Sequence, residues 1–311
     1  MPGLTAIELC AGAGGLSLGL EQAGFLPVAL IDNEPHACAT LRTNRPQWNT
    51  IEADLNAFDL SSWAGVDLIT GGLPCPPYSL AGMQRGPDDE RDLFPKMLEI
   101  VGYVNPRAIL IENVRGMLQS KFTDVRNSVD YELKVMGYDP YWAMLNAADF
   151  GTPQNRYRVF LIAINRDEPG ELQWPFPSSF RHPPTVGQAI GDLMGENGWV
   201  RAEEWAAQAN QVAPTIVGGS KKHGGPDLGP TRARRAWAEM GVDGLGVANS
   251  PPDRDFVGMP RLTSRMVARI QGFPDDWSFF GSKTQQCRQI GNALPPPLAY
   301  AVAGSVAKCL S

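Results

Sequence analysis

The chain of 311 residues is 43% hydrophobic and 19% charged, which is enough apolar content for a large core and excludes a disordered chain. Its five cysteines form no C-x-x-C pair and no Cys/His cluster, so we expect neither a disulfide framework nor a metal site. The net charge of −6 argues against a nucleic-acid partner unless basic residues gather on one face. The lack of a long apolar run or basic leader predicts a cytoplasmic protein with no membrane partner.

A strand, a glycine loop and a helix are predicted at the start of the chain. Residues 6–9, Ala-Ile-Glu-Leu, are predicted to form the first strand, and the sequence Cys-Ala-Gly-Ala-Gly-Gly follows at residues 10–15. The glycines allow a tight turn and a close approach to a ligand. There is no Gly-Lys-Ser/Thr, and Ser17 stands where a dinucleotide fingerprint requires its third glycine. The loop therefore suits a nucleoside without pyrophosphate, although a purely structural turn remains an alternative.

Carboxylates follow the next two predicted strands. Residues 28–31 form the second strand, which ends in Asp32-Asn33-Glu34, about twenty residues after the glycine loop, where an acidic side chain can accept from both ribose hydroxyls. The alternative for this triplet is a helix cap, because Pro35 follows it. Asp54 closes a third short strand, where it can either accept from an adenine amino group or cap the next turn.

Cys75 lies between prolines just after the strand predicted at residues 66–70. The carboxyl end of a strand in an open α/β sheet is where ligands bind. Pro74 and Pro76 fix φ on both sides of the cysteine and so hold its thiol rigidly. Cys75 is therefore a candidate nucleophile. The alternative is that it is a small buried hydrophobic residue, as free cysteines often are.

Glu112 occupies the carboxyl end of the strand predicted at residues 108–111, which we expect to neighbour the strand before Cys75. A partly desolvated carboxyl group there can serve as a general acid near neutral pH. An ion pair or a helix cap is the alternative role.

Further along, Arg156 and Arg158 are expected on one face of a strand that continues into Val159, so that two guanidinium groups side by side suit a phosphate or a carbonyl oxygen.

With these pieces in order, the chain resembles the DNA (cytosine-5)-methyltransferases of the bacterial restriction-modification type over nearly its whole length. The blocks that carry the resemblance are E-L-C-A-G-A-G-G (8–15), D-N-E (32–34), P-C-P-P-Y-S (74–79), E-N-V (112–114), Q-N-R-Y-R (154–158), R-L-T-S-R-M-V-A-R-I-Q-G-F-P (261–274) and Q-I-G-N-A (289–293). Each block alone is modest. Together, in the family's order and near its spacing, they are specific.

The resemblance implies a fold and a division of the chain. The expected fold is α/β, a Rossmann-like sheet for S-adenosylmethionine-dependent methyl transfer with a second, smaller target-recognition domain. Residues 1–166, completed by 288–311, are expected to form the catalytic and cofactor-binding domain. Residues 167–287 are expected to form the target-recognition domain and hinge.

The resemblance also implies a reaction. A thiolate adds to carbon 6 of cytosine, which makes carbon 5 nucleophilic enough to accept a methyl group. Cys75 matches that thiolate, Glu112 matches the residue that relieves charge at ring nitrogen 3, and Arg158 with Arg156 matches the pair that holds the cytosine carbonyl and a nearby phosphate. The target base must be flipped out of the duplex for these groups to reach it.

The expected cofactor is S-adenosylmethionine, with S-adenosylhomocysteine as product and no metal. The positions that match the family's cofactor residues are Cys10, Gly12, Gly14, Gly15, Leu16, Asn33, Glu34, Asp54, Leu55, Pro74, Asn292 and Ala293. Two of the positions around this site depart from the family. Cys10 stands where phenylalanine is usual, and Pro35 stands where an aromatic residue often stacks, which puts the affinity for the cofactor in doubt more than its identity.

Double-stranded DNA is the expected partner. Five basic residues and a single acidic residue, Asp227, lie between residues 221 and 235. This excess of positive charge predicts a DNA-facing surface, which would allow an acidic protein to bind DNA through one face. A solvated charged face is the alternative. The expected DNA-binding residues are Ser79, Lys221, Lys222, Arg232, Arg234 and Arg235. Arg261, Arg265 and Arg269 are expected on a helix that organises the packing of the smaller domain. A monomer is expected, and a cognate restriction endonuclease acting on the same site is a further partner that the resemblance allows.

Three rival functions compete with this interpretation. A dinucleotide-dependent oxidoreductase explains the glycine loop and Glu34 but not Cys75, Glu112 and the arginines. A transfer-RNA cytosine-5 methyltransferase shares the catalytic blocks, and we disfavour it because the region before Arg261 is long and basic. A non-catalytic DNA-binding homologue is disfavoured because every proposed catalytic side chain is present.

Overall fold

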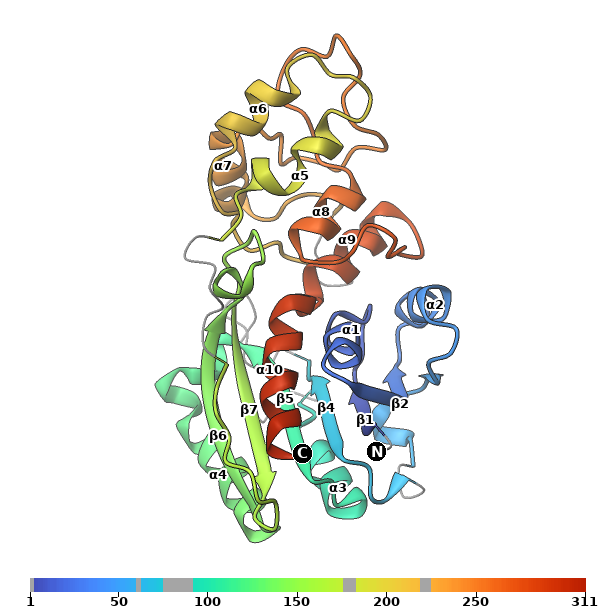
Figure 1. Ribbon diagram of the computed structural model, residues 1–311, viewed down its shortest axis with the longest axis vertical. Coiled ribbons are helices and arrows are strands. Elements are labelled where there is room, and N and C mark those ends of the chain that lie inside the picture. Colours follow the sequence, from blue (N-terminus) through green and yellow to red (C-terminus); the bar gives the residue numbers. More distant parts are fainter. Residues whose placement is uncertain (1–2, 60–62, 75–91, 176–182, 219–224) are drawn as a thin grey trace. The chain divides into compact units, whose positions relative to one another are not determined.

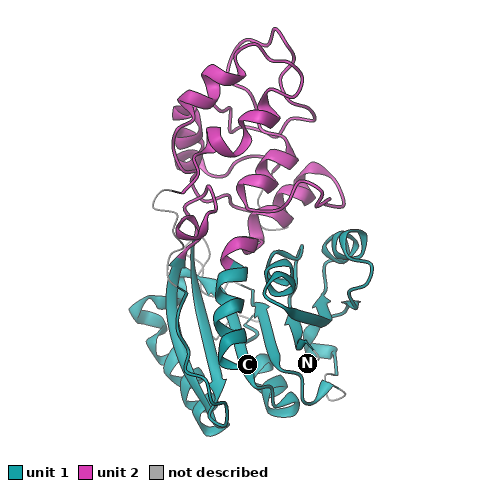
Figure 2. Ribbon diagram, in the orientation of Figure 1, with its two compact units in different colours: residues 1–145, 157–176, 299–311 teal, residues 146–156, 177–298 magenta. Residues whose placement is uncertain are grey.

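The computed structural model describes residues 3–59, 63–74, 92–175, 183–218 and 225–311. The chain divides into two compact units (Figure 2). We call residues 1–145, 157–176 and 299–311 the sheet unit, and residues 146–156 and 177–298 the helical unit.

These boundaries differ from the expected ones in three places, one of which is that residues 167–176, expected in the target-recognition domain, belong to the sheet unit. Residues 146–156 and 288–298 are expected in the catalytic domain, but both belong to the helical unit. The first stretch is tied there by backbone hydrogen bonds, since Asn155 N donates to Ala213 O and Ala213 N donates to Pro153 O, each at 2.9 Å. The second packs backbone to backbone, because a Cβ added to Gly291 would meet Gly218 N at 2.3 Å. Long-range contacts that no local pattern encodes therefore set the division.

The sheet unit is built on one sheet of seven strands in the order β3-β2-β1-β4-β5-β7-β6 (Figure 1). The strands are β1 (Leu4–Leu9), β2 (Phe25–Asp32), β3 (Thr50–Glu52), β4 (Leu68–Gly72), β5 (Ala108–Val114), β6 (Tyr138–Asn146) and β7 (Tyr157–Asn165). The pairs β1–β2, β1–β4, β2–β3 and β4–β5 are parallel, whereas β5–β7 is antiparallel. The expected α/β class is confirmed, and the strand expected to continue into Val159 is β7, whose antiparallel direction was not predicted.

Helices cover both faces of this sheet. Among the residues that the structure describes, the helices of the sheet unit are α1 (Gly15–Gln22), α2 (Pro35–Asn44), α3 (Phe94–Val104) and α4 (Thr123–Val135), with most of α10 (Pro296–Cys309) and the 3-10 turns η1 (Leu55–Ala57), η4 (Arg115–Leu118) and η5 (Ser120–Phe122). Side chains such as Ile7 and Ile109 share a core with Met97 of α3 and Leu133 of α4. Successive side chains of a strand point to opposite faces of the sheet, so Glu8 of β1 faces the side opposite to Ile7. On that side α1 and α10 pack closely, because a Cβ added to Gly19 would meet Ala299.

The helical unit consists of short helices joined by long connections. They are η6 (Ala147–Phe150), α5 (Val186–Met194), α6 (Ala202–Gln208), α7 (Thr231–Glu239), α8 (Ser264–Ile270) and α9 (Lys283–Asn292). Trp205 and Trp237 are buried in its core, as is Met266. Burial of large aromatic side chains compensates for the scarcity of regular structure.

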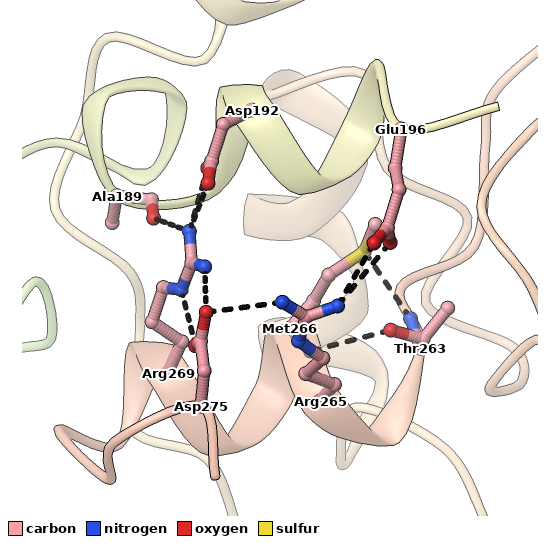
Figure 3. Close-up of polar contacts among 8 residues, drawn as sticks. All are labelled: Ala189, Asp192, Glu196, Thr263, Arg265, Met266, Arg269 and Asp275. Atoms are coloured by element: carbon pink, nitrogen blue, oxygen red, sulfur yellow. Dashed lines mark hydrogen bonds and ion pairs between the residues drawn. The ribbon is translucent and has the colours of Figure 1, made fainter. Parts of the chain in front are cut away.

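An ionic network joins α5 to α8 and the turn after it (Figure 3). Arg269 lies between Asp192 and Asp275, and Arg265 bonds to Glu196 and Asp275. The expectation that these two arginines organise packing is therefore confirmed. Arg261 differs from expectation because the Thr263 cap starts α8 after it, so Arg261 lies outside the helix and pairs with Asp243 at 2.7 Å.

Candidate active site

The loop after β1 has the backbone that the glycines predict. Gly12 and Gly14 have φ values of +56° and +88°, and Cys10 adopts the left-handed region as well, at +56°. A non-glycine residue there costs roughly 1–2 kcal/mol, and such strain gathers at functional sites. A Cβ built on Gly12 meets nothing within 4 Å, so this side of the loop is open to a ligand. The backbone therefore forms a turn that can lie against a nucleoside.

The loop leads into α1, whose first residues are buried. Gly14 is the N-cap and makes no side-chain cap, and Gly15 is the first helical residue. Leu16 is 4% exposed, so its side chain belongs to the core and only its backbone can serve a ligand. Below the loop, the Ser17 hydroxyl donates to the buried carboxyl group of Glu8.

The triplet Asp32-Asn33-Glu34 at the end of β2 combines a cap with a candidate ligand. Glu34 is the N-cap of α2 without a side-chain cap bond, and Pro35 is the first helical residue, which accounts for a proline at that position. Nδ1 of His36 lies 3.2 Å from Oε1 of Glu34. Asn33 is exposed. Glu34 therefore lies at the loop end of β2, and its contact with the ribose stays a prediction.

Asp32 of the same triplet makes contacts that sequence reasoning missed. Its Oδ2 accepts from Gly12 N at 2.7 Å, and its Oδ1 accepts from Glu34 N at 2.8 Å. One carboxylate thus joins the two loops that carry expected cofactor residues. The only sequence signal was an acid two residues before Glu34, which a cap explained equally well.

Asp54 caps the turn that follows β3. Its Oδ1 accepts from Asn56 N at 2.9 Å, and Leu55 is 4% exposed in the resulting 3-10 turn η1. The capping alternative is therefore present. A carboxylate has two oxygens, so this cap does not prevent Oδ2 from accepting from an adenine amino group.

The carboxyl ends of β4 and β5 lie side by side, as expected. Gly72 pairs with Glu112, which is 6% exposed, and a Cβ on Gly72 would lie 3.2 Å from Oε2 of Glu112. Arg158 Nε lies 2.6 Å from Oε1 of Glu112. Glu112 therefore has its ion pair on one oxygen and faces the end of β4 with the other. Pro74 is half-buried, and Cys75, the next residue, lies outside the described residues, as do Ser79, Lys221 and Lys222.

Arg156 differs from the expected pair of side-by-side guanidinium groups. β7 begins at Tyr157, so strand alternation does not apply to Arg156. Its side chain is fully buried in the helical unit, where Nη1 donates to Ile216 O at 2.8 Å and Nη2 donates to Gly291 O at 2.7 Å. Arg156 is therefore occupied by backbone carbonyls, and Arg158 is the arginine at Glu112.

The remaining expected site residues lie in the helical unit. Asn292 ends α9 and is exposed, and Ala293 O accepts from Gln271 Nε2 at 2.6 Å. Because these residues and the glycine loop belong to different units, their approach to the cofactor stays a prediction. On α7, Arg232 and Arg235 are exposed, whereas the Arg234 side chain covers Gly244.

The residues of the sheet unit fit the nucleoside of S-adenosylmethionine. An open left-handed loop follows β1, and carboxylates stand at the ends of β2 and β3 where hydroxyl and amino groups can donate to them. Within the described ranges, no group of three or more His, Cys, Asp or Glu residues could hold a metal ion. Within those ranges too, no helix is long and apolar enough to span a bilayer.

Comparisons with known proteins identify the family of the chain. A family model for C-5 cytosine-specific DNA methylases matches residues 4–308. The chain is similar to the type II methyltransferase M.NgoMIV of Neisseria gonorrhoeae, at 49% identity over 98% of each chain. It is also 49% identical to the type II methyltransferase M.NaeI of Lentzea aerocolonigenes, over 100% of this chain and 76% of that protein.

Solved structures show the same fold at low sequence identity. A DNMT2 mutant from Spodoptera frugiperda superimposes with a TM-score of 0.68 at 19% identity, covering 97% of this chain and 99% of that one. The Entamoeba histolytica methyltransferase EhMeth gives a TM-score of 0.66 at 16% identity, covering 98% of both chains. These likenesses concern the fold alone.

Proposed function

From the premise that this chain belongs to the C-5 cytosine-specific DNA methylase family, we propose that it flips a cytosine out of duplex DNA and methylates it through a covalent bond to Cys75. The family assignment makes the chain an S-adenosylmethionine-dependent DNA methyltransferase of the restriction-modification type. The proposal adds the steps of the reaction and the residues that perform them.

The single observation that carries the proposal is the position of Glu112. Its Oε2 lies against Gly72 at the end of β4, three residues before Cys75, and its Oε1 is held by Arg158. A thiol that follows β4 and a carboxyl group at the end of β5 are thus supplied by adjacent parallel strands. Addition of a thiolate to carbon 6 and protonation of ring nitrogen 3 need two such groups on one edge of the sheet.

The reaction follows from these groups. The Cys75 thiolate forms a bond to carbon 6, and a proton carried by Glu112 neutralises the negative charge at ring nitrogen 3. S-adenosylmethionine supplies the methyl group for carbon 5. A base then removes the carbon 5 proton, the bond between carbon 6 and sulfur breaks so that Cys75 leaves as a thiolate, and ring nitrogen 3 returns its proton to Glu112. We assign Arg158 to holding Glu112 and the cytosine carbonyl, and Arg156 to the interior of the helical unit.

The cofactor assignments rest on the sheet unit and on two residues outside it. The residues proposed to contact the donor are Cys10, Gly12, Gly14, Gly15, Leu16, Asn33, Glu34, Asp54, Leu55, Pro74, Asn292 and Ala293. Leu16 would serve through its backbone, since its side chain is in the core.

The helical unit is proposed to recognise the DNA. Unstacking the target base costs a few kcal/mol, which contacts to phosphates and base edges must offset. Arg232 and Arg235 are exposed on α7 and suit that task, together with Ser79, Lys221 and Lys222 outside the described residues. A monomer acts on the site in this proposal, and a cognate endonuclease cleaves the same sequence when it is unmethylated.

Bisulfite sequencing of a host genome that expresses the protein tests this function. Wild-type protein is expected to protect one cytosine position within a single sequence, and Cys75→Ala is expected to protect none. Cys287→Ala is the matched control, because burial raises the pKa of the Cys287 thiol to about 11 and keeps it unreactive. Methylation that survives in Cys75→Ala, or that appears on transfer RNA and not on DNA, would refute the proposal.

A further inference from the structure

We propose that Asp32 is the positioning residue of the donor-binding site, because it joins the three segments that carry its ligands. The inference rests on the proposed assignment of Gly12, Glu34 and Asp54 to the donor. It gives Asp32, a member of the D-N-E block, a role that neither the resemblance nor the comparisons assign to it. Asp32 acts in this view through the backbone around it, without touching the donor.

The carboxylate of Asp32 connects the first two segments. Oδ2 accepts from Gly12 N at 2.7 Å and Oδ1 accepts from Glu34 N at 2.8 Å. Hydrogen bonds to an ionised acceptor are stronger than neutral ones. They fix the amide of a glycine whose φ is +56°, and they fix the backbone from which the Glu34 side chain projects.

The backbone carbonyl of Asp32 connects the third segment. Asp32 O accepts from Ala53 N at 3.0 Å, and Ala53 directly precedes Asp54. The same oxygen lies 3.4 Å from Cys38 Sγ of α2. Burial raises the pKa of the Cys38 thiol to about 12, so the thiol stays protonated and donates a hydrogen bond to that oxygen. One residue therefore contacts the glycine loop, the start of α2 and the end of β3.

A local turn does not account for this arrangement. An aspartate at the start of a helix often accepts from the amide two residues later, and the bond to Glu34 N is of that kind. The bond to Gly12 N spans twenty residues and links two different strand ends. A turn at Glu34 forms without the bond to Gly12 N. A site that binds ribose and adenine at once needs that bond, because it fixes the distance between the glycine loop and Glu34.

Asp32→Asn tests the inference, because the amide keeps the size of the side chain but presents N–H groups to one of the two backbone donors. We expect the dissociation constant for S-adenosylhomocysteine, measured by calorimetry, to rise roughly 10- to 100-fold, as the loss of one charge-assisted hydrogen bond implies. The KM for S-adenosylmethionine should rise in parallel, with a much smaller change in kcat and in the KM for DNA. Hydrogen exchange at the Gly12 amide of the ligand-free protein should accelerate.

Asp67→Asn is the matched control. Asp67 also accepts from a backbone amide, Thr5 N at 2.7 Å, but it does so at the amino ends of the strands. Its loss should lower stability without weakening S-adenosylhomocysteine binding. Unchanged affinity in Asp32→Asn, equal weakening in Asp67→Asn, or an unaltered Gly12 amide would overturn the inference. Wild-type protein that binds S-adenosylhomocysteine but leaves cytosine unmodified would contradict the proposed function alone, because the binding comparison would still decide the role of Asp32.

Discussion

Glu8 is a carboxyl group that the fold keeps protonated. It lies in the middle of the layer between β1 and α1, where the Ser17 hydroxyl donates to it. Burial raises its pKa from an ordinary value of 4.5 to about 8, and the nearby charge of Asp32 acts in the same direction. Between these two values the unfolded chain ionises Glu8 while the folded protein does not. The folded state then binds more protons, so the contribution of Glu8 to stability falls as pH rises from 4.5 to 8.

Replacing this carboxyl group should therefore stabilise the protein in a pH-dependent way. Glu8→Gln keeps an acceptor for the Ser17 hydroxyl, but the glutamine side chain does not ionise in the folded or the unfolded protein. We expect its melting temperature relative to the wild type to rise between pH 5 and pH 8, as measured by calorimetric scans. A difference between the two proteins that is constant over this range would show that Glu8 does not titrate there.

The pair of Glu112 and Arg158 makes a second prediction at this scale. Glu112→Gln keeps the shape of the side chain but cannot deliver a proton to ring nitrogen 3. We expect single-turnover methyl transfer to slow by about 10²- to 10⁴-fold, the usual contribution of general acid–base catalysis. S-adenosylhomocysteine binding should stay within a few-fold of wild type.

Glu168→Gln is the control for that substitution. Glu168 forms an equally short ion pair, 2.6 Å from Arg107, at the opposite end of β5. Its loss should leave the rate of methyl transfer unchanged. A loss of rate as large in Glu168→Gln as in Glu112→Gln would mean that the effect is structural.

Charged side chains join α5 to α8 and to the turn after it. Arg269 bonds to Asp192 and Asp275, and these bonds hold the pKa of both carboxyl groups below the ordinary 3.8. A lowered pKa stabilises the fold above that value, and the stabilisation disappears as pH falls through the shifted pKa. The network is partly exposed, so its strength is modest and is screened by salt.

Arg269→Met tests this contact. We expect a loss of about 1–2 kcal/mol in the stability of the helical unit at pH 7, because two charge-assisted contacts disappear together. The difference from wild type should shrink below pH 3.8 and at high salt. Urea denaturation followed by tryptophan fluorescence measures it, since Trp205 and Trp237 lie in that unit. An equal loss at both pH values would mean that packing, and not charge, supplies the stability.

The elements that local patterns encode were predictable, and the long-range contacts were not. Alternation and glycine position found the β1 loop and placed Glu112 at the end of a strand beside β4. Strand alternation also suggested that Arg156 stands beside Arg158. Its partners lie 60 and 135 residues away, at Ile216 and Gly291, and no local rule indicates them. Asp32 was missed for the same reason, since its bond to Gly12 closes a loop of twenty residues.

At the scale of the whole molecule, an acidic chain must still hold DNA. The net charge is −6, so affinity depends on where the basic residues are exposed. On α7, Arg232 and Arg235 are exposed, whereas Arg234 packs its side chain against Gly244. The two exposed arginines are three residues apart and therefore lie on one face of the helix.

The double variant Arg232→Ala/Arg235→Ala should weaken DNA binding in a salt-dependent way. We expect the slope of log Kd against log salt to fall by about 0.9 for each phosphate that the variant no longer neutralises. Affinity for S-adenosylhomocysteine should stay at the wild-type value. Arg234→Ala is the comparison, and it should lower stability more than it changes the salt slope. An unchanged slope in the double variant would place the DNA elsewhere.

The central claim is that Cys75 bonds to carbon 6 of an extruded cytosine while the methyl group is transferred. Duplex oligonucleotides with 5-fluorocytosine at the methylated position test it directly, because fluorine cannot be removed as the carbon 5 proton is, so the covalent adduct accumulates. With S-adenosylmethionine present, we expect wild-type protein to form a complex that survives denaturing electrophoresis, and Cys75→Ala to form none. Failure of the wild type to become linked to that DNA, under conditions in which it methylates the unsubstituted duplex, would contradict the account.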